Sequence, residues 1–213
     1  MELSKVRIII FFVAVLLAGC AGVSLKSSER WVERHTLYST SSPSMELQVS
    51  PYFKFTDVKA KGSIVEISGE NLRTGVDTET FYFDGKKYKK SSLLISFDSL
   101  NANSRFSMKV PDYSKKSIFF MSPDHKMIGG IKFDTAILLN ILRGPSLVKA
   151  FGAVVEEKTR FQIMYMEEVD SSWLEKDPAL LTNEDLEFVS KFNKRADDSF
   201  SISPYSGQPG PVQ

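Results

Sequence analysis

Cys20 is the only cysteine in this chain of 213 residues, and its thiol is the strongest nucleophile among the side chains. A single cysteine cannot form a disulfide within the chain, so attack on an electrophile is the chemistry left to it. Leu17, Ala18 and Gly19 come directly before it. Small side chains such as those of Ala18 and Gly19 fit the cleft of a signal peptidase. This stretch therefore predicts a processing site that ends at Cys20.

The segment before Cys20 has the pattern of a signal peptide. Lys5 and Arg7 supply a short positive region, and residues 8–17 are ten consecutive apolar residues. As a helix this run is about 15 Å long, half of a hydrocarbon core of about 30 Å. It is therefore too short to span a membrane and is typical of a secretory signal.

The sequence Leu17-Ala18-Gly19-Cys20 resembles the lipobox of bacterial lipoproteins, and the resemblance covers about the first twenty residues. In that class the cysteine thiol takes a diacylglycerol as a thioether, the preceding peptide is removed and the new amino group is acylated. The resemblance implies that Cys20 carries the lipid and that a signal peptidase recognises the three residues before it. The alternative is an ordinary amino-terminal membrane anchor with an incidental cysteine.

The residue after the cysteine predicts which membrane holds the lipoprotein. Similar Gram-negative lipoproteins with Asp at this position stay on the inner membrane, so Ala21 implies the outer membrane. We expect the domain to be held there by acyl chains on Cys20, on the periplasmic side. In a host with a single membrane, the same anchor would hold the domain on its outer face.

The remaining reactive side chains form no catalytic or metal-binding pattern. The only two histidines, His35 and His125, are 90 residues apart, and no Gly-x-Ser-x-Gly motif offers a nucleophile. Ser122 lies near His125 in a polar stretch that predicts a turn. Met164 and Met166 are soft enough to bind copper, but without a nearby histidine they are better explained as core residues. We therefore expect no enzymatic activity, no cofactor and no metal.

Charge and composition limit the kinds of molecule that the mature protein is expected to bind. Removal of residues 1–19 takes Lys5, Arg7 and Glu2 from 27 basic and 26 acidic residues, and it leaves 25 of each. A protein that binds nucleic acid normally has a basic excess, so we expect no such partner. A hydrophobic content of 42% with 16 Phe is enough for a packed core without disulfides.

The chain divides into a signal peptide over 1–19, a lipidated cysteine and flexible tether over 20–30, one domain over 31–200 and a disordered tail over 201–213. Six to eight short strands are predicted between residues 45 and 133 from alternating apolar residues and regular turns. Their spacing favours a mainly β fold with helices (α+β), either an antiparallel sandwich or an open barrel.

Helices are expected in the second half. The apolar runs around 135–157 predict one or two buried helices, because the first is apolar almost all round and the second repeats at three and four. Residues 160–169 predict a central strand with both faces covered. Thr182 followed by Glu184 and Asp185 resembles a capping box and predicts a carboxy-terminal helix over about 183–196.

A lysine-rich hairpin is the clearest local pattern. Asp84-Gly85 follows an aromatic strand and predicts a two-residue turn. Four lysines come next: Lys86, Lys87, Lys89 and Lys90. One interpretation is contact with the anionic surface of a membrane, and the other is an edge strand whose lysines prevent aggregation.

Three functions remain open. The first is a non-catalytic structural or interaction module of the cell envelope, with another envelope protein as partner, and it predicts an exposed apolar patch or strand edge. The second is a carrier of a lipid or other lipophilic ligand, which predicts an apolar cavity. The third is a hydrolase, which would need a cleft around His125 or acidic side chains.

Overall fold

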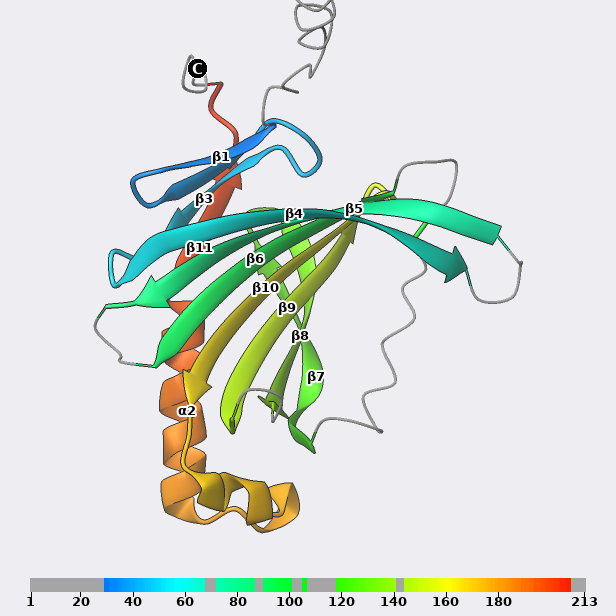
Figure 1. Cartoon of the computed structure of the whole chain (residues 1–213). Coiled ribbons are helices and arrows are strands. Elements are labelled where there is room, and N and C mark those ends of the chain that lie inside the picture. The colour runs from blue at the N-terminus through cyan, green and yellow to red at the C-terminus, as the bar shows by residue number, and fades with distance from the viewer. Residues whose placement is uncertain are drawn as a thin grey trace, which may run out of the picture.

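A computed structural model of the chain describes residues 29–67, 72–86, 90–100, 105–106, 118–140 and 144–207. The strands in these ranges form two antiparallel sheets (Figure 1). The smaller sheet has the order β1 (Arg30–Glu33), β2 (Thr36–Ser39), β3 (Met45–Val49) and β11 (Phe200–Pro204). The larger has the order β4 (Phe53–Ile67), β5 (Leu72–Gly85), β6 (Ser91–Leu100), β10 (Thr159–Glu168), β9 (Ser146–Val155), β8 (Ile131–Asn140) and β7 (Ile118–Ile128).

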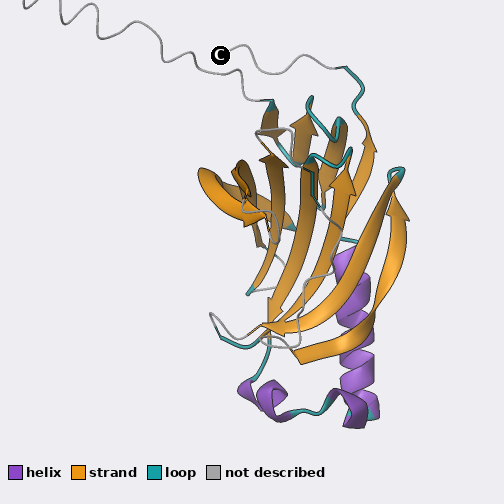
Figure 2. Ribbon diagram, turned by 90° about the vertical axis from the view of Figure 1, so that its right-hand side faces the viewer, coloured by secondary structure: helices purple, strands orange, loops and turns teal. Residues whose placement is uncertain are grey.

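Three helical segments follow β10 along the chain. They are the short 3₁₀ helices η2 (Ser171–Glu175) and η3 (Pro178–Leu180) and the α-helix α2 (Asn183–Asp197). Figure 2 shows α2 against the curved larger sheet, with η2 and η3 at the end of the molecule away from the smaller sheet. The mainly β character, the antiparallel pairing and the carboxy-terminal helix agree with the sequence prediction.

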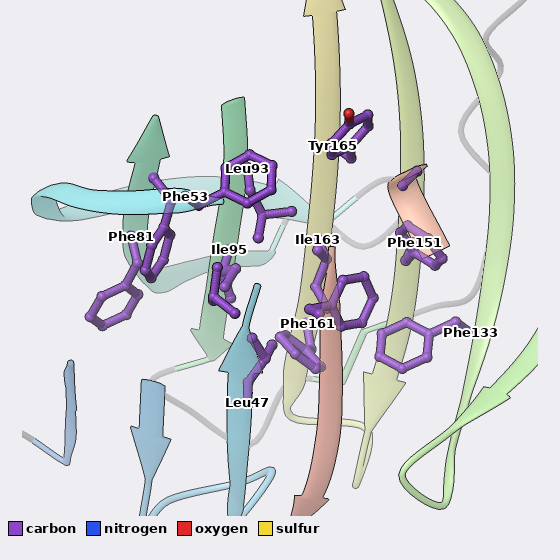
Figure 3. Packing of buried hydrophobic residues seen from close by; sticks show 14 of the residues in the cluster. Leu47, Phe53, Phe81, Leu93, Ile95, Phe133, Phe151, Phe161, Ile163 and Tyr165 are labelled. Carbon is purple, nitrogen blue, oxygen red and sulfur yellow. The ribbon is translucent and has the colours of Figure 1, made fainter. Parts of the chain in front are cut away.

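The inner face of the larger sheet builds the core. Phe161, Ile163 and Tyr165 alternate along β10 and are almost fully buried. Because paired residues of antiparallel strands share a face, Phe97 and Ile95 of β6 lie beside them. Figure 3 shows Ile95 of β6, Phe151 of β9 and the three residues of β10 on the same side of the larger sheet as Leu47 of the smaller sheet.

Two elements cover this inner face. The smaller sheet covers one end with Leu37, Leu47 and Val49, which are fully buried. Helix α2 covers the other end, where Phe192 packs against Tyr165 with ring centroids 5.5 Å apart. The arrangement is a two-layer sandwich, in which the second layer is part sheet and part helix.

The helices predicted around 135–157 are wrong, because this region forms β8 and β9. In β8, burial alternates with a period of two: Ile137 and Leu139 are buried, and Ala136 and Leu138 between them are half-buried. Both strands are central in the sheet, where side chains of the neighbouring strands shield outer-facing apolar residues such as Leu138 in part and leave them half-buried. Such runs lose the alternation by which a strand is recognised in a sequence.

Two turn predictions are also corrected. Asp84 and Gly85 do not form the turn, because they are still paired with Lys54 and Phe53 at the end of β5. The return strand β6 is central rather than an edge, since it pairs with both β5 and β10. Gly129 and Gly130 predict a bulge or bend within one strand over 127–133, but they form the tight turn between β7 and β8, with positive φ angles.

The remaining sequence predictions are mixed. Helix α2 begins as predicted, because Thr182 caps it and exchanges hydrogen bonds with Asp185 in a capping box. Strand β10 is central as predicted, and α2 packs on its inner face, whereas the segments around 135–157 are strands of the same sheet rather than covering helices. The tail predicted over 201–213 is wrong at its start, since β11 continues to Pro204, and residues 208–213 lie outside the described residues.

Candidate functional site

The predicted lipid-anchor residues lie outside the described residues. These are Cys20 and the peptidase-recognition residues Leu17, Ala18 and Gly19. The description begins at Glu29, and β1 follows directly at Arg30. An anchor at Cys20 would therefore connect to the domain through β1 of the smaller sheet.

The predicted lysine contact is only partly described, because Lys87 and Lys89 fall outside the described ranges. Lys86 is exposed. Lys90 is exposed too, and its Nζ lies 2.8 Å from a carboxylate oxygen of Glu168. The hydrogen bond and the charge of Glu168 raise the pKa of Lys90, so this lysine remains a cation.

Lys86 lies away from the start of the domain. Arg30 of β1 pairs with Glu79 of β5 at 2.6 Å. Gly85 ends β5 six residues further on, about 20 Å along the strand. Lys86, which follows Gly85, therefore lies about 20 Å along β5 from the residue that Arg30 contacts.

His125 lies in β7 rather than in the predicted turn. Its Nδ1 is 2.6 Å from Oδ1 of Asp134 in β8, and the two side chains are 65% and 35% exposed. A His–Asp pair of this kind orients an imidazole for proton transfer, but hydrolysis by the triad route also needs a hydroxyl or thiol within hydrogen-bonding distance. The side chain of Ser122 is not among those that the structure describes. His35, the other histidine, lies in the turn between β1 and β2.

Metal ligands do not gather within the described ranges, where no three His, Cys, Asp or Glu side chains come together. Met164 and Met166 are half-buried on the outer face of β10. Their cross-strand neighbours include Leu94 and Val148, which are apolar. The two methionines are therefore part of an apolar stripe across the centre of the sheet.

A buried lysine that the sequence did not single out joins α2 to the larger sheet. Lys149 of β9 is 5% exposed, and its Nζ donates to Asn193 Oδ1 at 2.5 Å and to Asp197 Oδ1 at 2.6 Å. Burial lowers the pKa of Lys149, and the hydrogen bond and charge of Asp197 oppose this change. Both side chains that accept hydrogen bonds from Lys149 come from α2, so this contact fixes the helix on the sheet.

A second polar cluster fixes the same helix. Arg195 of α2 donates from Nε and Nη2 to the two carboxylate oxygens of Glu167 at 2.6 and 2.7 Å. The Tyr165 hydroxyl donates to the same carboxylate, and burial raises the pKa of Tyr165 well above its usual value. A bidentate Arg–carboxylate pair has a fixed geometry, so it sets the rotation of α2 on the sheet.

Side chains fill the inner face where a lipophilic ligand would have to bind. Phe97 and Phe161 are stacked with centroids 4.8 Å apart, and Phe133 packs edge-on to Phe161 at 5.5 Å. Phe151 contacts Phe200 of the smaller sheet at 5.1 Å. The first three rings belong to the larger sheet, where Figure 3 shows Phe133 and Phe161 near each other, and the Phe151–Phe200 contact joins the two layers.

The hairpin of β4 and β5 extends beyond the rest of the sheet. The two strands pair from Phe53 and Gly85 to Ile67 and Leu72, but β5 pairs with β6 only from Val76 onward. The distal part of the hairpin is therefore a two-stranded arm, visible at the right of Figure 1. On β4, Val58 and Ile64 are 47% and 75% exposed, which is unusual for β-branched residues.

Strand β4 is also one edge of the larger sheet. An edge strand presents backbone N–H and C=O groups to which another chain can add a strand. Lys59 and Lys61 lie on this strand, where charged side chains oppose uncontrolled self-pairing. We call residues 57–67 and 72–77 the hairpin arm, of which only the distal part, residues 64–67 and 72–75, extends beyond β6. Single apolar residues such as Val58 and Ile64 do not predict an exposed arm in the sequence. The arm is recognised only from the pairing of β4 and β5 beyond β6.

The chain matches no family model, and no curated protein or solved structure proves significantly similar to it. Within the described part of the chain, no helix combines the length and the apolar character needed to cross a membrane.

Proposed function

We propose that this protein is an outer-membrane lipoprotein, anchored through Cys20, that acts as a non-catalytic interaction module of the cell envelope. The lipobox-like sequence around Cys20 supports the anchor, and Ala21 supports the outer membrane. The hairpin arm is the observation that carries the interaction role, because it is a long edge strand with exposed apolar side chains.

The arm suits a partner that contributes an extended strand. Its main-chain groups along β4 would supply the hydrogen bonds, and Val58 and Ile64 would supply apolar contacts. Lys59 lies 3.8 Å from the Asp57 carboxylate, so recognition would depend on the main-chain bonds and apolar contacts rather than on charge. The partner in this proposal is therefore another envelope protein rather than a small molecule.

The filled inner face supports this role over that of a lipid carrier. A carrier keeps a cavity of hundreds of Å³ for its ligand. In the described core, the aromatic side chains of both layers occupy the space beneath the larger sheet. The His125–Asp134 pair is the feature a hydrolase would use, but its exposed position favours a surface hydrogen bond.

Site-specific photocrosslinking in cells tests the interaction role. A photoreactive amino acid replaces Ile64 in the full-length protein, and the control places it at Leu180 of η3. These two side chains are similarly exposed, at 75% and 78%, but only Ile64 lies on the arm. We expect a discrete adduct from position 64 and none from position 180. The same adducts from both positions, or none from position 64, would contradict the proposal.

A further inference from the structure

Three aromatic side chains lie together on the smaller sheet. Trp31 of β1 stacks on Tyr38 of β2 with centroids 5.3 Å apart and an interplanar angle of 16°. Tyr205, one residue after β11, meets Trp31 edge-on at 6.3 Å and 87°. We call these three residues the aromatic cluster. All three are partly exposed, so the rings are not part of the core.

The strand register places this cluster on the outer face of the sheet. Trp31 is paired with Tyr38, and the neighbouring residue Leu37 is fully buried. Because successive side chains of a strand point to opposite faces, Tyr38 faces away from the core. The cluster is therefore built by three segments, β1, β2 and the residue after β11, on the side that the larger sheet does not cover.

The cluster is also next to the start of the domain. Trp31 comes two residues after Glu29, and residues 21–28 connect Glu29 to Cys20. An extended chain of this length reaches at most about 30 Å. In Figure 1 the chain enters the domain at the same end as the smaller sheet, and η2 and α2 extend to the other end. A bilayer that holds Cys20 thus lies within reach of the cluster.

The chemistry of the cluster fits the headgroup region of a bilayer. Tryptophan and tyrosine are enriched there, because their rings are apolar and their N–H and O–H groups bond to water and headgroups. The cross-strand neighbour of Tyr38 is Glu46, which accepts a hydrogen bond from the Ser206 backbone at 2.8 Å. The bonds from Ser206 lower the pKa of Glu46, so this carboxyl stays ionised at neutral pH.

The charges around the cluster exclude a basic surface. Arg30 pairs with Glu79 of the larger sheet and lies over the Phe97 ring at 4.2 Å, so its guanidinium is directed into the core. Glu46 is the charged side chain across from Tyr38. Contact with a bilayer would therefore depend on the rings rather than on attraction to anionic lipids, and it would resist salt.

We propose that Trp31, Tyr38 and Tyr205 insert into the headgroup region of the membrane that holds Cys20. This inference rests on the lipid anchor proposed above, and it adds an orientation to it. The smaller sheet faces the bilayer, and the end with η2 and the amino terminus of α2 points away. The two contacts together, acyl chains and aromatic rings, restrict a domain that a tether alone would leave free to rotate.

Tryptophan fluorescence tests this orientation, because the chain has two tryptophans, one in β1 and one in η2, and these elements lie at opposite ends of the domain (Figure 1). Trp31 is in the cluster, and Trp173 is 7% exposed in η2. The acylated full-length protein and its Trp31→Phe variant are placed in phosphatidylcholine vesicles that contain brominated lipids. The difference between the two spectra isolates the emission of Trp31, and Trp173→Phe gives the same emission directly.

We expect shallow bromine labels to quench most of the Trp31 emission and to leave that of Trp173 unchanged. The quenching should persist in about 0.5 M salt, where the Debye length is only about 4 Å. Replacing Lys86 and Lys90 with Gln is the control, and it should not alter the quenching. Equal emission of Trp31 with and without the labels would overturn the inference.

Two further outcomes separate this inference from the anchor. If mass spectrometry finds Cys20 acylated but Trp31 is not quenched, the orientation is wrong and the anchor stands. If Cys20 carries no lipid, both fail. If Trp31 is not quenched in vesicles but is shielded from acrylamide in native membranes, the cluster binds a protein, and that also contradicts the inference.

Discussion

Replacing Gly129 with Ala should destabilise the domain, because this residue lies where the two sheets meet. Gly129 has a φ angle of 58° in the turn between β7 and β8. A Cβ at this position would be 2.6 Å from Cγ2 of Ile202 and 2.7 Å from its carbonyl oxygen. Relaxed contacts between carbon atoms are about 3.5–4.0 Å, so the turn or β11 would have to move by about 1 Å.

The neighbouring Gly130 separates the two contributions to the loss of stability, which are backbone strain and steric overlap. Gly130 has a φ angle of 82°, but no atom lies within 4 Å of where its Cβ would be. Gly130→Ala should therefore cost only the strain of a left-handed backbone, about 1–2 kcal/mol. Gly129→Ala should cost this strain and a further 1–3 kcal/mol, roughly, for overpacking against Ile202.

Chemical and thermal unfolding of the two variants measure the difference. At about 2–4 °C per kcal/mol for a domain of this size, Gly129→Ala should have a Tm lower than that of Gly130→Ala by about 2–12 °C. Circular dichroism in the folded state checks that both variants retain the sheets. Equal stabilities within about 0.5 kcal/mol would refute the close approach of the β7–β8 turn to β11.

Two other predictions concern α2. Thr182→Ala removes the side chain that accepts a hydrogen bond from the Asp185 backbone, so it should lower the free energy of unfolding in urea by about 1 kcal/mol. Thr182→Ser should lower it less, and equal losses in the two variants would count against the cap. Asp197→Asn leaves the buried Lys149 without its closest charge and should destabilise by several kcal/mol, whereas Lys149→Met should be neutral or stabilising. Because burial lowers the pKa of Lys149, the unfolded state binds more protons below about pH 10.5, and wild-type stability should rise with pH relative to Lys149→Met. Urea unfolding at about pH 7 and about pH 10 measures this difference, and parallel pH profiles of the two proteins would contradict it.

The sequence predicts best those features that depend on neighbouring residues. The cap at Thr182 and the apolar stripe of α2 are local, and both correspond to the observed helix. The strand over 45–49 agrees with β3, because Leu47 and Val49 alternate with polar residues. Local chemistry is sufficient in both cases, since only one face of each element contacts the core.

Features that depend on distant partners were not predictable. Strands β8 and β9 appear helical in sequence because both of their faces are apolar, and only their pairing inside the larger sheet explains this. The sequence around Lys149 does not predict that this lysine is buried, because its partners Asn193 and Asp197 follow more than forty residues later. Likewise, the sequence separates Trp31 from Tyr205 by almost the whole domain, and strand pairing brings them together.

The anchor at Cys20 supports both the proposed function and the proposed orientation, and mass spectrometry of the protein from isolated outer membranes tests it most directly. We expect the mature chain to begin at Cys20 and to carry a diacylglycerol thioether and an amide-linked acyl chain, whereas Cys20→Ser should accumulate as a precursor that begins at Met1. A wild-type chain with an unmodified Cys20, or a Cys20→Ser variant that matures and fractionates like wild type, would contradict the account.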